Sequence, residues 1–305
     1  MLHPKKLIKS RFARIAIRVI SVLLILYVGL SILGAILIMG VPRIPVEGSP
    51  ALVGLAYSEV SFPTRGDHIT LRGWYLSGQG DSALLVVHGG FQNRLDYEVD
   101  TLGLARDLVG RGYNILLFDL RGRGESEGKG ISMQNIESDI GGAIDYLESR
   151  GFVTEKIGII GFCSGAASAA IFASGEEVGA LVLDGCFATV RGMVTKQAAK
   201  YHIPKFLLDF FYPSLSFTVK IFYGYEPFDP VIAVSSVTCP VLFIHEEYDN
   251  LTTQEETHQL LEASDNPSSE MWEVGGVEHT QAYKTYPTQY VDRLDNFLAK
   301  QFEMP

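Results

Sequence analysis

One five-residue stretch carries side chains whose types and spacing could do covalent chemistry. Residues 161–165 read Gly-Phe-Cys-Ser-Gly, after an apolar run typical of a buried strand and before a small-residue run typical of a helix. A sharp strand-to-helix turn holds a nucleophile clear of the backbone, and it needs tiny residues two positions before and two positions after that nucleophile. Gly161 and Gly165 meet this need. The spacing therefore indicates Cys163 as a nucleophile.

Two other interpretations of this turn stay open. A turn centred on Ser164 would place Phe162 and Ala166 at the crowded positions, which fits the steric demand less well. A buried, unreactive cysteine at a tight turn is the second alternative. With three cysteines and 31 glycines in 305 residues, about 0.03 matches to Gly-x-Cys-x-Gly are expected by chance. A helix that begins beside the sulfur would also favour its negatively charged form.

The elements that must position this turn alternate along the chain. Short apolar runs suited to buried parallel strands occupy 83–89, 114–120, 156–162, 180–184 and 241–245. Helix candidates lie between and after them, near 96–110, 134–150, 164–174, 253–263 and 288–302. Two earlier segments, 59–63 and 69–76, look like a hairpin. The pattern predicts a doubly wound, mostly parallel α/β sheet whose functional loops meet at one edge.

Four further motifs stand in a defined order around the turn. They are His-Gly-Gly at 88–90, Asp-Leu-Arg-Gly-Arg-Gly-Glu-Ser at 119–126, His-Glu-Glu-Tyr-Asp at 245–249 and Gly-Val-Glu-His at 276–279. Over most of residues 58–302 the chain resembles the α/β-hydrolase superfamily, in which nucleophile, acid and histidine occur in this order. The resemblance implies a hydrolase of ester or other acyl bonds with a short cap.

The chain departs from that superfamily at two positions. Most members carry serine at the elbow, and the cysteine is similar to the dienelactone-hydrolase-like branch. The N-terminal apolar segment and the mid-chain cap described below do not look like that branch. A small residue usually follows the histidine of the 245–249 motif, whereas this chain has Glu246. The second departure puts the shape of the following loop in question.

The resemblance assigns catalytic roles that the residue types support. Cys163 would be the nucleophile, His279 the general base and acid, and Asp249 the carboxylate that orients the imidazole. A solvent-exposed loop histidine and an ordinary turn aspartate are the alternatives at the last two positions. Asp184, at the end of the 180–184 strand, is the reserve candidate for the acid.

An acyl-transfer site also needs backbone N–H groups that receive the developing oxyanion. The resemblance implies that one belongs to Ser164, the residue after the nucleophile. The other would come from Gly90 or Phe91, in the loop after the 83–89 strand. His88 is expected to brace that loop rather than to react.

Residues 187–230 interrupt the alternation of strands and helices. They are rich in aromatic side chains and too long for an ordinary connection, and long connections usually carry function. We expect a helical cap over the edge of the sheet. A segment that contacts a membrane, or a simple insertion, is the alternative.

The N-terminus predicts a membrane anchor. Residues 1–18 hold all six basic side chains of the first 41 residues and no acid, and residues 19–41 hold no charge. Twenty-three apolar residues suffice to cross a hydrocarbon core of about 30 Å. A cleaved signal peptide is the rival, but its apolar region is usually about 7–15 residues long. The basic leader predicts a cytoplasmic N-terminus and an extracytoplasmic body, with a linker at 42–57 and a hydrolase domain at 58–305.

Charge and composition narrow the possible partners. The net charge is −10 overall, and residues 42–305 alone carry 19 basic and 35 acidic side chains. An acidic surface argues against nucleic acid as a partner. The three cysteines form no CxxC pair, and the sequence has neither metal-ligand spacing nor a phosphate-binding glycine motif. We therefore expect no metal and no cofactor.

These observations predict a membrane-anchored hydrolase of ester, thioester or lactone bonds that uses a Cys163–His279–Asp249 triad. The aromatic cap and the anchor favour a small acyl substrate of apolar or lipid-like character. A catalytically silent hydrolase fold used for binding is the main alternative in another class. An acyltransferase and a relative of serine-type peptidases are further alternatives.

Overall fold

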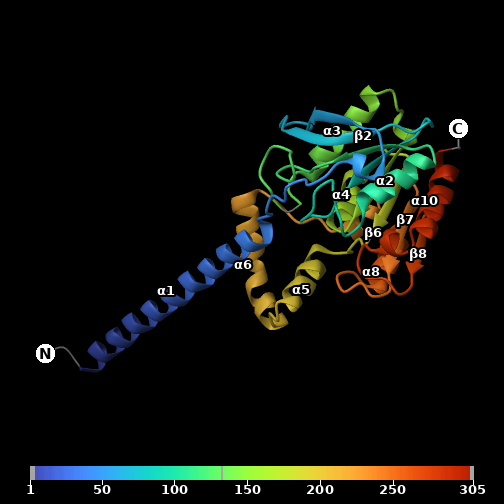
Figure 1. Ribbon diagram of the computed structural model, residues 1–305. Coiled ribbons are helices and arrows are strands. Elements are labelled where there is room, and N and C mark those ends of the chain that lie inside the picture. Colours follow the sequence, from blue (N-terminus) through green and yellow to red (C-terminus); the bar gives the residue numbers. More distant parts are fainter. Residues whose placement is uncertain (1–3, 132, 303–305) are drawn as a thin grey trace.

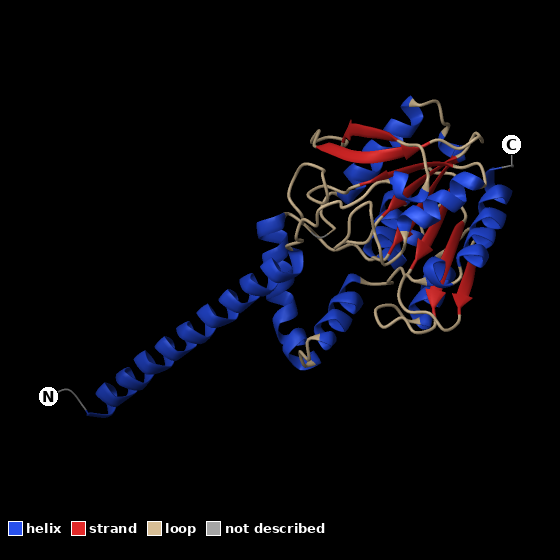
Figure 2. Ribbon diagram, in the orientation of Figure 1, coloured by secondary structure: helices blue, strands red, loops and turns tan. Residues whose placement is uncertain are grey.

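The computed structural model describes residues 4–131 and 133–302. The first three residues of the predicted leader, residue 132 and the last three residues of the predicted hydrolase domain lie outside this part. A long N-terminal helix leads into a domain in which helices cover both faces of one sheet (Figure 1). The strands stack side by side, and the helices lie outside them (Figure 2). This arrangement confirms the predicted α/β-hydrolase fold class.

The described residues contain one eight-stranded sheet with the order β1-β2-β4-β3-β5-β6-β7-β8. Only the pairs that involve β1 and β2 are antiparallel, and the pairs from β4 through β8 are parallel. The strands are β1 (Ser58–Pro63), β2 (Thr70–Leu76), β3 (Ala83–Val87), β4 (Asn114–Phe118), β5 (Ile157–Phe162), β6 (Ala180–Asp184), β7 (Val241–Glu246) and β8 (Glu270–Val274). The predicted hairpin and the predicted parallel strands are therefore all present.

Five longer helices cover the sheet close to where the sequence predicts them. They are α2 (Thr101–Gly110), α3 (Ile136–Ser149), α4 (Ser164–Ala173), α8 (Gln254–Ala263) and α10 (Pro287–Phe302). The prediction that α2 begins at residue 96 is wrong, because Asp100 caps this helix by accepting a hydrogen bond from the Gly103 N–H at 3.2 Å. Short helical turns complete the domain: η1 (Pro50–Val53), η2 (Thr154–Lys156), α7 (Pro230–Val234) and α9 (Ala282–Thr285).

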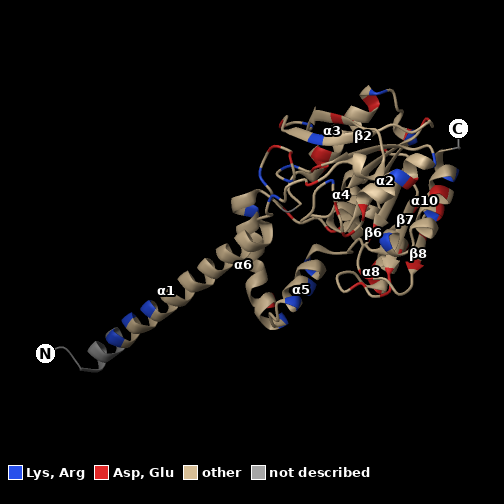
Figure 3. Cartoon of the chain, viewed as in Figure 1, with Lys and Arg blue, Asp and Glu red and all other residues tan. Residues whose placement is uncertain are grey.

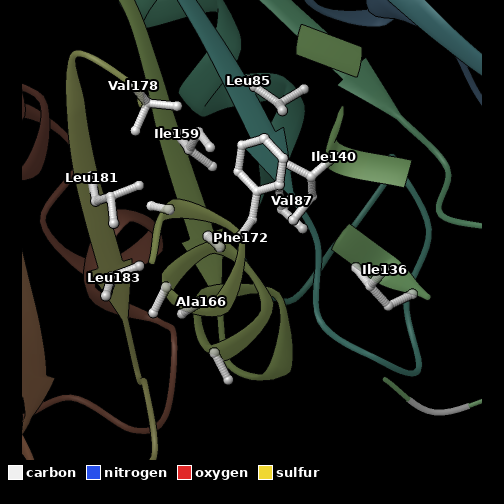
Figure 4. Close-up of a cluster of buried hydrophobic side chains, with 14 of the residues drawn as sticks. Leu85, Val87, Ile136, Ile140, Ile159, Ala166, Phe172, Val178, Leu181 and Leu183 are labelled. Atoms are coloured by element: carbon white, nitrogen blue, oxygen red, sulfur yellow. The ribbon is translucent and has the colours of Figure 1, made fainter. Parts of the chain in front are cut away.

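The apolar runs form strands because both faces of the sheet are buried. All six residues of β5 are buried, and they alternate between two hydrophobic clusters, with Ile159 in one and Ile160 in the other. The first cluster lies around α4, where Phe172 meets Val87 and Ile159 (Figure 4). Burial of both faces explains why these strands read as continuous apolar runs rather than alternating ones. This packing holds the β5–α4 turn at the carboxyl edge of the sheet.

The segment predicted as a linker lies against the domain. The Val41 N–H donates to the Gly130 carbonyl at 2.9 Å. The Arg43 guanidinium donates to the carbonyls of Gly124 and Ser126 at 2.8 and 2.6 Å. Further along, the Tyr97 hydroxyl donates to the Glu47 carbonyl at 2.6 Å. The bonds of Val41 and Arg43 fix the end of the N-terminal helix to the loop after β4, and the bond of Tyr97 fixes Glu47 to the loop after β3.

Helices also occupy the N-terminus and the aromatic segment. Helix α1 (Pro4–Met39) contains one stretch, Arg11–Met39, that is long and apolar enough to cross a membrane. The aromatic segment forms α5 (Val190–Lys200) and α6 (Lys205–Tyr223). Figure 1 shows α6 beside the end of α1 that joins the domain. The expected helices are thus present, and one of them packs on the N-terminal helix.

Candidate active site

The turn between β5 and α4 has the shape that its sequence predicts. Cys163 adopts φ 52° and ψ −118°, a backbone conformation that side-chain-bearing residues rarely adopt. A Cβ at Gly161 would lie 2.6 Å from the Ala166 Cα atom, and a Cβ at Gly165 would overlap the Val87 carbonyl oxygen. Neither glycine can therefore carry a side chain. Strained backbone of this kind is stored at functional turns at a cost of roughly 1–3 kcal/mol.

Ser164 occupies a different position in this turn. It is the first residue of α4, and its carbonyl accepts the Ser168 hydroxyl at 2.9 Å. Cys163 alone stands at the strained apex between the strand and the helix. The geometry therefore supports Cys163, rather than Ser164, as the exposed centre of the turn.

A histidine and an aspartate from two loops meet near this turn. His279 follows β8, and its Nδ1 lies 2.6 Å from the Asp249 Oδ2 atom in the loop after β7. Asp249 Oδ1 also accepts the N–H groups of Leu251 and Thr252 at 2.6 and 2.9 Å, and the Thr252 hydroxyl donates to Oδ2. Burial alone would raise the pKa of Asp249, but hydrogen bonding to His279 and Thr252 outweighs burial and lowers it. The carboxylate stays charged and fixes the Nδ1–H tautomer of His279.

Cys163 lies beside His279: its N–H donates to the Asp184 carbonyl at 2.9 Å, and the residue after Asp184, Gly185, lies against the His279 ring. Burial opposes the charged imidazolium, but electrostatic interaction with Cys163 and the hydrogen bond to Asp249 raise the pKa of His279 to about 10. Nε2 is buried and has no well-directed hydrogen bond within the described residues. Such contacts in unliganded sites often tighten only when substrate binds. The structure thus brings Cys163, His279 and Asp249 into one chain of interacting groups.

Asp184, the reserve candidate for the catalytic acid, lies next to these three residues but does not hydrogen-bond to His279. Asp184 accepts the Tyr290 hydroxyl at 2.8 Å, and its carboxyl neighbours that of Glu246. Burial raises the pKa of both carboxyls, and the charge on Asp184 pushes the pKa of Glu246 further upward. These raised pKa values favour the neutral form of Glu246. The Glu246 carbonyl still accepts the Asp249 N–H at 3.0 Å, so the unexpected glutamate leaves the turn to Asp249 intact.

The protonated state of Glu246 leads to a testable expectation. Glu246→Gln should change esterase activity by less than about threefold, because a neutral amide matches a protonated carboxyl in shape and charge. Glu246→Lys should lower the thermal stability, because burying an ammonium group costs more than its pairing with Asp184 returns. Activity and thermal unfolding of the purified chain measure both effects. A large loss in the glutamine variant would show that Glu246 acts as a carboxylate.

Sequence reasoning missed one residue of this site. Gly185 follows β6 with φ 62°, and a Cβ there would lie 2.7 Å from His279 Cε1 and 3.0 Å from Nδ1. Only glycine lets the backbone approach the imidazole this closely. The sequence signal for this residue was a glycine directly after Asp184, at the carboxyl end of a strand. That signal could not be interpreted from the sequence, because the importance of Gly185 depends on its contact with His279.

Gly185→Ala should displace the imidazole from its place between Asp249 and Cys163. We expect a fall in kcat/KM of about 10²-fold, since misplacement of a catalytic group by about 1 Å has effects of this size. Steady-state kinetics with an activated ester measure the loss. Gly151→Ala is the matched control, because Gly151 also has a positive φ of 99° but faces open space away from the site. Equal losses in the two variants would contradict the close-approach argument.

The loop after β3 lies against the same turn. A Cβ at Gly90 would come within 2.7 Å of the Ser164 Oγ atom, so Gly90 allows close contact between the two segments. His88 braces the loop: its Nδ1–H donates to the Gly89 carbonyl at 2.7 Å, and its Nε2 accepts the Leu120 N–H at 3.1 Å. Burial lowers the pKa of His88 to about 3, so it stays neutral. The N–H groups of Ser164, Gly90 and Phe91 donate no hydrogen bond among the described residues.

The remaining thiols and the carboxylate cluster do not add a second site. Cys186 and Cys239 are buried, and burial raises the pKa of both thiols. Ligand atoms of Glu246, Asp249 and His279 lie within 4.8 Å of one another. However, the Asp249–His279 hydrogen bond uses the oxygen and nitrogen that an ion would need, and burial raises the pKa of Glu246, which disfavours a free carboxylate there. This donor set therefore fits a hydrogen-bonded acid–histidine pair better than a metal.

Comparison with known proteins places this geometry in a family. A sequence profile of the alpha/beta hydrolase family matches residues 84–303, which is more than half of the chain. The chain belongs to the alpha/beta hydrolase family. It is 26% identical over 224 residues to the uncharacterized protein YqkD of Bacillus subtilis, covering 71% of each chain. It is 26% identical over 258 residues to the uncharacterized protein YfhR of Salmonella typhi, covering 77% of this chain and 79% of the other.

Solved structures of this alpha/beta hydrolase fold superpose on most of the chain. The Pyrococcus furiosus esterase Pf2001 aligns with a TM-score of 0.73 and 24% identity, covering 87% of this chain and 98% of the esterase. Est1E of Butyrivibrio proteoclasticus, with ferulic acid bound, aligns with a TM-score of 0.61 and 17% identity, covering 80% and 100% of the two chains. At these identities the likeness establishes the fold.

Proposed function

We propose that this alpha/beta hydrolase is a membrane-anchored esterase-type enzyme in which Cys163 attacks acyl carbonyls with the aid of His279 and Asp249. One observation supports this assignment above the others. The cysteine at the strained apex of the β5–α4 turn interacts with the imidazole that Asp249 orients. The esterase activity of the structural relatives is a second support.

The first half-reaction forms a thioester. The Cys163 thiolate attacks the ester carbonyl carbon, a C–S bond forms, and the carbonyl electrons move to the oxygen. The N–H groups of Ser164 and of Gly90 or Phe91 are placed to receive that oxyanion. When the intermediate collapses, the C–O bond of the alcohol breaks and His279 gives its Nε2 proton to the departing oxygen.

The second half-reaction releases the acid. Acylation removes the negative charge of the sulfur, which contributes to the raised pKa of His279, so the pKa falls and the imidazole stays neutral. Neutral His279 accepts a proton from water as the water attacks the thioester. The C–S bond then breaks, the carboxylic acid leaves, and the thiolate and imidazolium are restored. The net reaction consumes one ester and one water.

The anchor and the substrate class belong to the same proposal. Helix α1 carries positive charges only toward its N-terminus, and the rest of it is uncharged up to the domain (Figure 3). We assign α1 as a single membrane span with a cytoplasmic N-terminus and an extracytoplasmic catalytic domain. A catalytic domain held at a membrane and flanked by aromatic helices suits apolar acyl esters, and a cysteine nucleophile suits esters, thioesters and lactones.

An acyl-trapping experiment tests the proposed chemistry. The purified full chain in detergent is mixed with p-nitrophenyl butyrate, and the reaction is quenched in acid within the first turnover. Mass spectrometry should find one butyryl group, an added mass of about 70 Da, on the peptide that contains Cys163. An adduct on Ser164 would show that Ser164, and not Cys163, is the nucleophile. Absence of both product and adduct with several esters would favour a binding protein with a hydrolase fold.

A further inference from the structure

Helix α6 carries a large apolar surface that the domain does not cover. Five of its side chains are each at least 62% exposed, and we call them the α6 apolar face: Phe206, Phe210, Phe217, Ile221 and Phe222. Several large, exposed apolar side chains on one helix usually mark contact with a partner or a membrane. The question is what covers it.

Helix α6 packs on α1 along a stripe that adjoins the α6 apolar face, and the Phe210 ring of that face meets the Tyr27 ring edge-on, with centroids 5.1 Å apart. The Tyr27 ring stacks on Phe211 with centroids 5.1 Å apart, and the Tyr27 hydroxyl donates to the Phe210 carbonyl at 3.0 Å. One turn further, Ser31 and Ser214 share a hydrogen bond between their hydroxyls.

The same stripe of α1 continues toward the domain. Ala35 and Met39 form a small buried cluster with Leu215 and Val219 of α6. The buried residues on this side of α1, which are Ser31, Ala35 and Met39, recur every four residues, and the first two have small side chains. Small residues and a serine hydrogen bond are typical of helices that pack within a membrane.

The position of this stripe fixes the depth of α6. Arg18 is the last charged residue before the uncharged stretch 19–41. A hydrocarbon core of about 30 Å needs about 20 residues of helix, so the core reaches from just after Arg18 to near residue 38. Tyr27, Ser31 and Ala35 all fall inside these limits. Side chains of α6 that touch them must therefore lie in or against the same bilayer.

We propose that α6 is a second membrane-embedded element, which inserts the α6 apolar face among lipid acyl chains in the leaflet nearest the catalytic domain. The lipid bilayer is the occupant because the helix that α6 packs on is itself the span. This inference depends on the proposed anchor but not on the proposed catalytic residues. It makes α1 and α6 one membrane-bound unit joined to the domain through α5 and residues 224–229.

The charges on α6 are compatible with this position. It carries three charged residues, and all three are paired. Asp209 accepts Lys205 and Arg191 at 2.6 and 2.9 Å, and Lys220 donates to Glu226 at 2.9 Å. Phe210, next to Asp209, contacts Tyr27, so Asp209 lies at about the depth of Tyr27, where its two partners balance its charge, and Lys220 lies closer to the domain, beside Glu226. The middle of the helix, between Asp209 and Lys220, is uncharged.

Lipid photolabelling tests the proposal with the full chain. The protein is reconstituted in phosphatidylcholine vesicles that contain a phospholipid with a diazirine on its acyl chain, illuminated, digested and mapped by mass spectrometry. We expect adducts on α6 peptides at a yield similar to that on α1, and about tenfold above that on α8, a solvent-facing helix of the domain. Phe217→Glu should lower the α6 yield by about threefold or more while the α1 yield is kept, and Phe217→Leu should leave both unchanged.

The possible results distinguish membrane insertion of α6 from the proposed α1 anchor, and they distinguish lipid from another protein as the partner that covers the α6 apolar face. Adducts on α1 without adducts on α6 would overturn the proposal and leave the anchor standing. Adducts on neither helix would overturn both. Strong crosslinks between the α6 helices of two copies, with no lipid adducts on α6, would show that a second chain covers this face and would also overturn it. None of these results depends on ester hydrolysis.

Discussion

Cys163→Ala should lower kcat/KM for p-nitrophenyl butyrate by at least about 10⁴-fold, because single removal of a nucleophile from a catalytic unit has an effect of this order or larger. Cys163 stands at the strained apex of the turn, and it interacts electrostatically with His279. Steady-state kinetics measure the loss. Thermal unfolding should change little, since alanine fills the same site with a smaller side chain.

Two matched variants sharpen this result. Ser164→Ala should reduce activity by less than about tenfold, because the proposed role of Ser164 lies in its backbone N–H, which alanine keeps. Cys163→Ser should keep more activity than Cys163→Ala. Loss of the sulfur's negative charge lowers the pKa of His279 and frees the imidazole to act as a base for a hydroxyl. If Ser164→Ala is as damaging as Cys163→Ala, the assignment of the nucleophile is wrong.

The sequence predicted the fold well because each buried strand has a local signal. A run such as 157–162 is apolar throughout, and that pattern, bounded by turn residues, favours a short strand buried on both faces. The elbow was predictable for a similar reason. Gly161 and Gly165 are required by steric contacts within a few residues or with the adjacent strand, so their spacing alone carries the information.

The rest could not be predicted because it depends on contacts between distant segments. Gly185 matters only because His279 packs on it. Glu246 looked like a disturbance of the acid loop, but its burial beside Asp184 keeps it protonated and harmless to that loop. That Asp184 bonds to Tyr290 while Asp249 bonds to His279 likewise became visible only in the structure. Nor does any local signal show that the 205–223 helix packs along the N-terminal one, because that contact joins residues 183 positions apart.

The linker shows the same limit. Residues 42–57 are rich in proline and glycine, which predicts a tether, yet Arg43 binds carbonyls of the loop after β4. The pattern describes the absence of helix and strand correctly. It does not report the long-range hydrogen bonds that hold the segment on the domain and so set the distance between α1 and the sheet.

Asp249→Asn should lower kcat/KM by about 10³–10⁴-fold, because it imposes the wrong histidine tautomer. One carboxylate oxygen of Asp249 accepts the N–H groups of Leu251 and Thr252, so the carbonyl oxygen of an asparagine would take that place. Its NH₂ group would then face His279 Nδ1 and donate to it. Nδ1 would have to become an acceptor, and the remaining proton would stay on Nε2, where it cannot accept a proton from water.

Asp184→Asn is the matched control, since Asp184 is an equally buried carboxyl that bonds to Tyr290 and not to His279. We expect a loss of less than about tenfold there.

The pH profile separates a tautomer effect from simple loss of structure. Asp249 helps to hold the pKa of His279 at about 10, so its neutralisation must lower that pKa. The alkaline limit of acylation, measured by a single-turnover burst, should move to lower pH in Asp249→Asn and stay near pH 10 in Asp184→Asn. If Asp184→Asn shows the large loss and the shift to lower pH while Asp249→Asn does not, then Asp184 is the carboxylate that orients His279, and the triad is Cys163–His279–Asp184.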